Sequence, residues 1–432
     1  MALRMIAAMT MICAGTLGAQ DRPAAAADAR PTSPLAKPSM PVAGAYALDD
    51  LLTLARRENF ALQSARAQAL AGRAGVTTAR AYPNPDFEVM GASFRARTPG
   101  TLGGSGSTLG FSQRIENPGL RSARVEAATA GAQAGEINVW VVENNLVAEI
   151  KSRFFETLRR EEELDAARED LALTQQIRDR IRVRTRTGEA ARFDLIRADN
   201  EVSLALRQLE RSGARVAEAK AFLKQAVSPA LPAEFAVAGD FYRQTPRADY
   251  ASLRDAVLVA NPELKRALAE LARSESQVEV ERQLVLPSVQ LRIVSENEPE
   301  IRSVRGGVAL SVPLWDRRRG PIDEARAQAI RSRSESDLRR FSLAQGFEAG
   351  WQQYQAALKS LQALEGGILE QARTVVDIAE AAYRFGERGI LEYLDARRQL
   401  RAVRADLINT RFELHAAKAE LERLAATEIK GE

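Results

Sequence analysis

Apolar residues recur with a seven-residue period in two long stretches of the chain, which is the period of a coiled coil. The two series lie 198 residues apart. They are Val202, Leu209, Val216 and Leu223, and then Leu400, Leu407, Leu414 and Leu421. A seam of this period predicts long helices that pack side by side, and its second occurrence indicates an internal duplication.

Other residues also recur in the two halves. Matching residues near the start of each half are 202 positions apart, and those near the end are 198 positions apart. The pairs are Asn59 and Asn261, Pro85 and Pro287, and Gly188 and Gly386. Each half is predicted to begin with a helix that a proline ends, followed by two strands and more helix. The stretch 118–187 could form about 105 Å of helix, with a hairpin turn expected near 159–165.

The N-terminus has the pattern of a secretory signal, with Arg4 before an apolar run and Gly18-Ala19 as a small-residue cleavage site. The only cysteine, Cys13, is expected to leave with this signal rather than to carry a lipid, because Met11 and Ile12 precede it. The predicted organisation is a signal peptide at 1–19, a Pro/Ala-rich linker at 20–44, a first repeat at 45–227, an inter-repeat joint at 228–249, a second repeat at 250–427 and a tail at 428–432.

Two short segments in each half alternate in polarity, at 86–94 and 108–115 and again at 288–295 and 307–315. In three of the four, one face is apolar and the other is small or polar. No other strands are predicted that could build a core on the apolar face. The alternation therefore favours strands of a transmembrane barrel. Four strands cannot close a barrel, and open edges are not tolerated in lipid, so several chains are expected to share one wall.

Charge and composition exclude several functions. The 61 basic and 57 acidic residues are interspersed and give a net charge of only +4, so a nucleic-acid partner is not expected. No Ser/His/Asp, Cys/His or clustered-carboxylate constellation is present, so the chain is not expected to be an enzyme. His415 is the single histidine, and one histidine makes no transition-metal site. We expect no cofactor and no resident metal.

Together these features resemble the TolC-like outer-membrane factors, the exit ducts of tripartite efflux and secretion systems. The resemblance rests on the duplicated helix–strand–strand–helix plan, on the prolines that open the strands, and on glycine-plus-acid helix openings such as GILEYLDARRQL at 389–400. The segment SVPLWDRRRGPIDEARAQA at 311–329 is similar to the strand-to-helix passage of the branch that serves heavy-metal exporters, for cobalt/zinc/cadmium or copper/silver.

The resemblance implies a mainly α fold with a small transmembrane β-barrel. Three chains would share twelve strands, four from each, and would build one long coiled-coil α-barrel tunnel in the periplasm. It also implies an outer-membrane homotrimer in contact with lipid. Its expected partners are a periplasmic adaptor (membrane fusion) protein and an inner-membrane pump of the resistance-nodulation-division type.

The resemblance also implies a periplasmic gate in the second helix opening. Glu392 and Asp395 would form acidic rings that attract cations and repel anions. Tyr383 and Arg388 would latch the gate against Asp194 of the first half. Phe193 replaces a small hydroxyl residue of the better-known members, which leaves the resting state of this latch open.

Two classes of function remain in competition at this point. An exit channel for heavy-metal cations is favoured, and the same kind of duct could carry organic toxicants, drugs or a secreted polypeptide. A periplasmic coiled-coil adaptor or tether would explain the heptads and the signal. It would have no use for four alternating strands.

Overall fold

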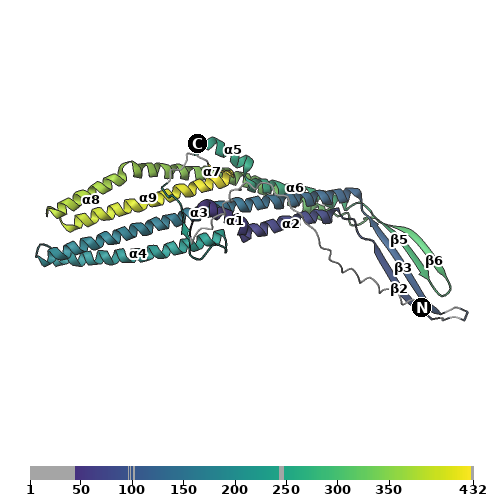
Figure 1. Ribbon diagram of the computed structural model, residues 1–432. Helices are drawn as coiled ribbons and strands as arrows, with labels where there is room; N and C mark the ends of the chain where they lie inside the picture. Colours follow the sequence, from purple (N-terminus) through teal and green to yellow (C-terminus); the bar gives the residue numbers. More distant parts are fainter. Residues whose placement is uncertain (1–43, 96, 98, 101–102, 243–247, 430–432) are drawn as a thin grey trace, which may run out of the picture. The chain divides into compact units, whose positions relative to one another are not determined.

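The computed structural model describes residues 44–429 except 96, 98, 101–102 and 243–247. The expected signal peptide, Cys13, nearly all of the expected linker and the last three residues of the tail lie outside the described residues. The helices of the first half are α1 (Leu48–Glu58), α2 (Phe60–Arg80), α3 (Pro118–Arg186) and α4 (Arg192–Val227). Those of the second half are α5 (Tyr250–Ala260), α6 (Pro262–Gln283), α7 (Arg319–Ala363), the π-helix η1 (Leu364–Ile368), α8 (Leu369–Arg384) and α9 (Ile390–Ala425) (Figure 1).

The first helix of each half is broken by the repeated asparagine, which the sequence did not predict. Asn59 separates α1 from α2, and its Oδ1 accepts from the backbone N–H of Ala61 at 2.9 Å. Asn261 separates α5 from α6 and caps α6 in the same way. The amide Nδ2 of Asn261 also donates to the Leu424 carbonyl at 2.8 Å. Each asparagine thus begins one helix and binds the end of another.

The prediction of a hairpin turn near 159–165 is wrong, because α3 runs unbroken for 69 residues. Residues 159–165 contain no glycine or proline that would favour a turn. Its charges also support helix, since Arg160 pairs with Glu156 at 2.9 Å and with Glu163 at 2.8 Å along one helical face. The chain reverses direction only at 187–191.

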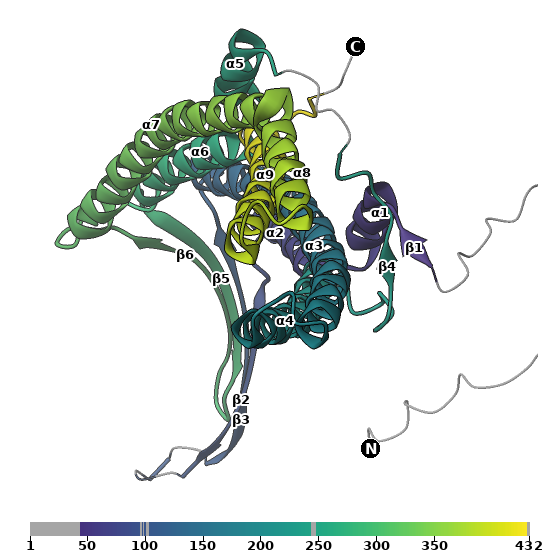
Figure 2. The same cartoon turned by 90° about the vertical axis from the view of Figure 1, so that its left-hand side faces the viewer.

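The larger sheet has the strand order β2–β3–β5–β6 and is antiparallel throughout. Its strands are β2 (Asp86–Phe94), β3 (Gly104–Ile115), β5 (Ser288–Asn297) and β6 (Arg302–Ser311). They curve together as one layer (Figure 2). β2 has the predicted bounds, β3 begins earlier and β5 ends later. β6 was predicted at 307–315 but spans 302–311, because a tight turn brings Arg302 opposite Asn297 and the ladder ends where β5 begins.

One face of this sheet is apolar and exposed. The register aligns Phe111 with Ile293 and Leu291 with Val308 on this face, and Val308 is 66% exposed. The opposite face is polar. On it, Arg292 Nη2 pairs with Glu88 Oε2 at 3.4 Å, and Gly110 lies beside Glu88 without a side chain to block it.

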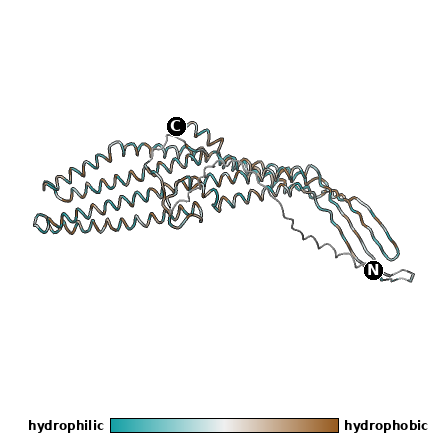
Figure 3. The backbone as a smooth tube through the Cα atoms, viewed as in Figure 1, coloured by the Kyte–Doolittle hydropathy of each residue, from teal (hydrophilic) through white to brown (hydrophobic). Residues whose placement is uncertain are grey.

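The helices pack through hydrophobic clusters, and each half of the chain has a corresponding one. One cluster contains Leu51, Ile150 and Leu223 of α1, α3 and α4, and a second contains Leu253, Phe347 and Leu421 of α5, α7 and α9. A two-stranded parallel sheet pairs β1 (Ala45–Tyr46) with β4 (Ala236–Val237) of the inter-repeat joint. Figure 3 shows hydrophobic and hydrophilic residues interleaved along the helices. None of the helices in the described part has an apolar stretch long enough to cross a bilayer.

Candidate functional site

Two helix-to-helix turns, at 187–191 and 385–389, occupy equivalent places in the repeats. Each contains a glycine with positive φ, 81° at Gly188 and 74° at Gly386. A residue with a side chain would lose about 1–2 kcal/mol of stability in this conformation. In both turns the N–H that follows the glycine donates to a carbonyl five residues earlier, at 2.9 and 3.0 Å. The repeated glycines are therefore helix caps.

A hydrophobic cluster next to these turns joins the two halves. Its buried members are Ile177 and Ile181 of α3, Ala198 of α4, Val376 of α8, and Ile390, Tyr393, Leu394, Ala396 and Leu400 of α9. The cluster fixes which side of α9 faces the rest of the chain, and it leaves the opposite side exposed.

Glu392 and Asp395 lie on this exposed side, in the first two turns of α9. Arg388 Nη1 donates to Glu392 Oε2 at 2.7 Å, which partly neutralises that carboxylate. Asp395 accepts from the amide Nε2 of Gln399 at 3.3 Å and forms no ion pair among the described residues. Of the two predicted acids, Asp395 therefore carries the less compensated charge.

The predicted latch residues lie near the turns but do not meet as a set. Tyr383 stacks on Tyr393 with ring centroids 6.2 Å apart, and the Arg184 guanidinium of α3 lies 5.0 Å from the Tyr383 ring. Tyr383 thus contacts the first half through Arg184. Within the part of the chain that is described, neither Tyr383 nor Arg388 contacts Asp194, whose backbone N–H donates to the Ala191 carbonyl.

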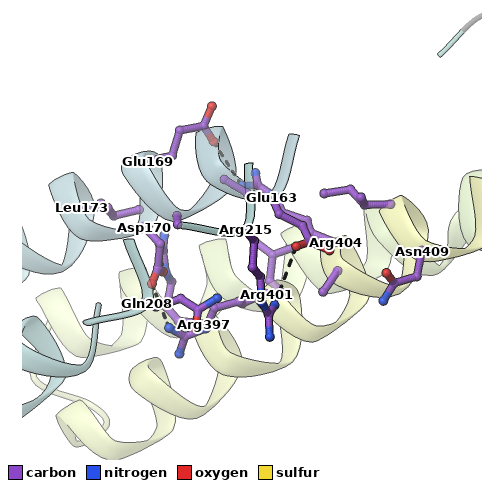
Figure 4. A pocket seen from close by; sticks show the side chains of 15 residues that line it. Glu163, Glu169, Asp170, Leu173, Gln208, Arg215, Arg397, Arg401, Arg404 and Asn409 are labelled. Carbon is purple, nitrogen blue, oxygen red and sulfur yellow. Dashed lines mark hydrogen bonds and ion pairs between the residues drawn. The ribbon is translucent and has the colours of Figure 1, made fainter. Parts of the chain in front are cut away.

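A set of ion pairs that sequence reasoning missed connects α9 with α3. Arg401 Nη1 contacts Asp170 Oδ2 at 2.7 Å and Arg397 Nη2 contacts Asp170 Oδ1 at 3.8 Å, while Arg404 Nη1 contacts Glu169 Oε2 at 3.4 Å (Figure 4). We call these five residues the inter-half clasp. Successive arginines three and four residues apart on α9 were a signal for one charged helix face, but the sequence did not say which acids they meet.

The inter-half clasp lies along a cavity of about 400 Å³ between α3, α4 and α9 (Figure 4). Leu173, Leu400 and Ile408 form part of its apolar lining. Beyond the clasp, Arg398 of α9 forms an ion pair with Glu201 of α4. The two halves are thus held together by charge pairs beside an incompletely filled space.

His415 is a packing residue. Its ring stacks on Phe155 with centroids 3.9 Å apart, and its Nε2 lies 3.4 Å from the Phe241 carbonyl of the joint. Burial, followed by the nearby Lys418 and Arg411 charges, lowers the pKa of His415 to about 4, although the Phe241 carbonyl acts in the opposite direction. Among residues 44–429, apart from the undescribed positions, no group of three or more His, Cys, Asp or Glu could hold a metal ion.

Comparison with known proteins identifies the family. The family model for outer membrane efflux proteins matches residues 51–228 and 253–427, one match for each repeat. The cobalt-zinc-cadmium resistance protein CzcC of Cupriavidus metallidurans is 25% identical over 384 residues, which cover 88% of this chain and 90% of the relative. Protein CyaE of Bordetella pertussis is 28% identical over 388 residues, covering 85% of this chain and 80% of the relative.

The solved structures give the same fold. The crystal structure of CusC superimposes with a TM-score of 0.76 at 18% identity, over 88% of this chain and 91% of the other. Channels of this family lie in the outer membrane, form trimers and work with an adaptor and an inner-membrane pump. They are transport conduits and not enzymes. Because the two matches cover most of its length, the chain belongs to the outer membrane efflux protein family.

Proposed function

We propose that three copies of this chain form an exit duct for heavy-metal cations, with four strands from each copy in one twelve-stranded barrel. The observation that carries this proposal is the open sheet. Its exposed face is apolar, with Phe87 and Val89 each about three-quarters exposed, and its two edge strands have no further partner in the described chain. An adaptor and a pump of the resistance-nodulation-division type would deliver the cargo.

The support for metal cations as cargo comes from two features. The relative that matches 88% of the chain is named a cobalt-zinc-cadmium resistance protein. In addition, Glu392 and Asp395 both lie exposed beside the turn at 385–389, and carboxylate rings attract cations. Organic toxicants or a secreted polypeptide are the alternative cargo for the same duct.

The gate proposal follows from the partners of these acids. Since Arg388 pairs with Glu392, the ring of three Asp395 carboxylates would supply most of the cation preference. The resting gate would be held by the inter-half clasp and by the Arg184–Tyr383 contact. Asp194, Tyr383 and Arg388 remain candidates for a latch formed between copies.

The test of cargo is a deletion strain challenged with cobalt, zinc and cadmium salts and, separately, with organic toxicants. We expect loss of metal resistance, restored by the full chain and only in part by Asp395→Asn. Asp406→Asn is the matched control, because Asp406 is an exposed acid on the same helix without a partner in the described chain. Loss of resistance to organic compounds alone would overturn the metal proposal.

A further inference from the structure

The polar face of the four-stranded sheet carries acidic and basic residues in equal number. Within the four strands these are three acids and three arginines, namely Asp86, Glu88, Arg114, Arg292, Glu296 and Arg305. Four of them form two ion pairs. Arg292 Nη2 contacts Glu88 Oε2 at 3.4 Å, and Arg305 pairs with Glu296. We call these four paired residues the charged belt.

The pair of Glu88 and Arg292 spans a strand that neither residue belongs to. Glu88 lies on β2 and Arg292 on β5, and β3 runs between them. Gly110 of β3 is directly opposite Glu88. A Cβ at this glycine would lie 3.2 Å from the Glu88 Cβ and 3.3 Å from its Oε2. The absence of a side chain at Gly110 thus lets the two charges meet across β3.

The two pairs of the charged belt lie at the same height in the sheet. The register places Glu88, Gly110, Val294 and Arg305 in one row across the four strands. Arg292 lies in the next row of the polar face toward one end of the sheet, and Glu296 lies in the next row toward the other end. The charged belt therefore occupies three successive rows, and its positive and negative charges cancel within them.

The charged belt lies behind apolar residues of the opposite face. Phe111 and Ile293 are paired between the row of Glu88 and the row of Arg292, and they belong to the exposed apolar face. In the proposed barrel this apolar face contacts lipid, and the polar face lines the pore. A low-dielectric wall concentrates the field of charges in a narrow aqueous passage. An uncompensated charge at this height would therefore act strongly on a passing ion.

Stability gives little reason for the pair of Glu88 and Arg292. The side chain of Arg292 is 59% exposed and that of Glu88 is 48% exposed, and ion pairs of such exposure contribute little to the free energy of unfolding. Their effect on the pore is larger. An unpaired acid here would retain a passing cation, and an unpaired arginine would repel it, whereas conduction requires that a bound ion can leave.

We propose that the charged belt keeps the barrel section of the pore electrically neutral, so that ion selection is left to the periplasmic gate. The inference rests on the proposed duct and adds Glu88 and Arg292 as residues that determine its ion permeability. Each acts by cancelling the charge of the other. Removal of one partner should therefore shift selectivity in the direction of the charge that remains.

Reversal potentials of the full chain, recorded in planar bilayers under a gradient of potassium chloride, test this proposal. Glu88→Gln leaves Arg292 uncompensated and should lower the cation-to-anion permeability ratio about threefold. Arg292→Gln leaves Glu88 uncompensated and should raise the ratio by a similar factor. The double variant should return to the wild-type ratio. Both single effects should shrink as the salt rises from about 0.1 M to about 1 M, because salt screens the charges.

Arg302→Gln is the matched control. Arg302 lies on β6, as Arg305 does, but alternation places it on the opposite, apolar face of the sheet. Its replacement removes the same charge from the outside of the proposed barrel and should leave the permeability ratio unchanged. If Glu88→Gln fails to assemble, Arg292→Gln carries the test through its change in the opposite direction.

The outcomes separate the two proposals. Unchanged ratios in Glu88→Gln and Arg292→Gln, in a protein that is trimeric and conducts, would overturn the role of the charged belt and leave the duct intact. An equal change in Arg302→Gln would do the same. A protein that is monomeric in detergent and adds no conductance would overturn the proposed function together with the role of the charged belt.

Discussion

At Asp170, a single isosteric substitution can test the coupling between the two halves. Its carboxylate contacts two arginines of α9, Arg401 at 2.7 Å and Arg397 at 3.8 Å. Asp170→Asn keeps the volume of the side chain and removes its charge. The two guanidinium groups would then face a neutral amide, and the inter-half clasp would be weakened.

The size of the effect follows from the exposure of these groups. The side chains of Asp170 and Arg397 are each 19% exposed, and that of Arg401 is 45% exposed. Exposed pairs contribute roughly 0–1 kcal/mol, and breaking a fully buried pair costs about 3–5 kcal/mol. We expect an intermediate loss of about 1–2 kcal/mol. Since 1.4 kcal/mol is a factor of ten, the closed-to-open ratio of the gate should fall about 5- to 30-fold.

Single-channel recording in planar bilayers measures this ratio as an open probability. Asp165→Asn is the matched control, because Asp165 pairs with Arg168 of its own helix at 2.7 Å and has no ion pair with the second half among the described residues. An open probability of Asp170→Asn equal to that of the wild type would refute the reasoning. So would an equally large increase in Asp165→Asn.

Three further predictions concern other parts of the chain. Asn261→Ala should lower the free energy of unfolding, measured by guanidinium denaturation, by about 2–4 kcal/mol, because it removes a helix cap and leaves the buried Leu424 carbonyl unpaired. Asn261→Asp should lower it by less, since the aspartate keeps an oxygen that accepts at the cap. The pKa of about 4 for His415 lies below its ordinary value of 6.5, so the unfolded chain binds the proton first and the free energy of unfolding should fall as the pH drops from 6.5 to 4. His415→Phe should reduce this dependence on pH in unfolding curves taken across that range. Arg388→Gln should release the charge of Glu392 and raise the cation-to-anion permeability ratio by up to about fivefold; an unchanged reversal potential would exclude Glu392 from the pore.

The sequence predicted those features of the fold that depend on local pattern. The repeat intervals defined two equivalent halves. All four strands of the larger sheet overlap the predicted segments, and alternation was clear in three of those segments. The predicted mainly helical fold and the membership of an outer-membrane efflux family are confirmed. The end of β6 differed because a strand ends where its partner ends, and the partner expected beyond Ser311 is another chain.

The site was less predictable because its contacts depend on how helices are rotated against each other. The pair Arg388–Glu392 could have been read from its spacing of four residues. The contact between Arg401 and Asp170 joins residues 231 positions apart, and no local pattern encodes it. Tyr383 was expected to meet Asp194, but in the described chain its ring lies against Arg184 and Tyr393.

The central claim is that the exposed apolar face of the four-stranded sheet joins those of sister chains to form a pore through the outer membrane. Reconstitution of the purified, detergent-extracted protein into planar bilayers tests it most directly. We expect discrete conductance steps from a trimeric particle, with cations more permeant than anions. A protein that stays monomeric in water without detergent and adds no conductance to the bilayer would contradict the claim.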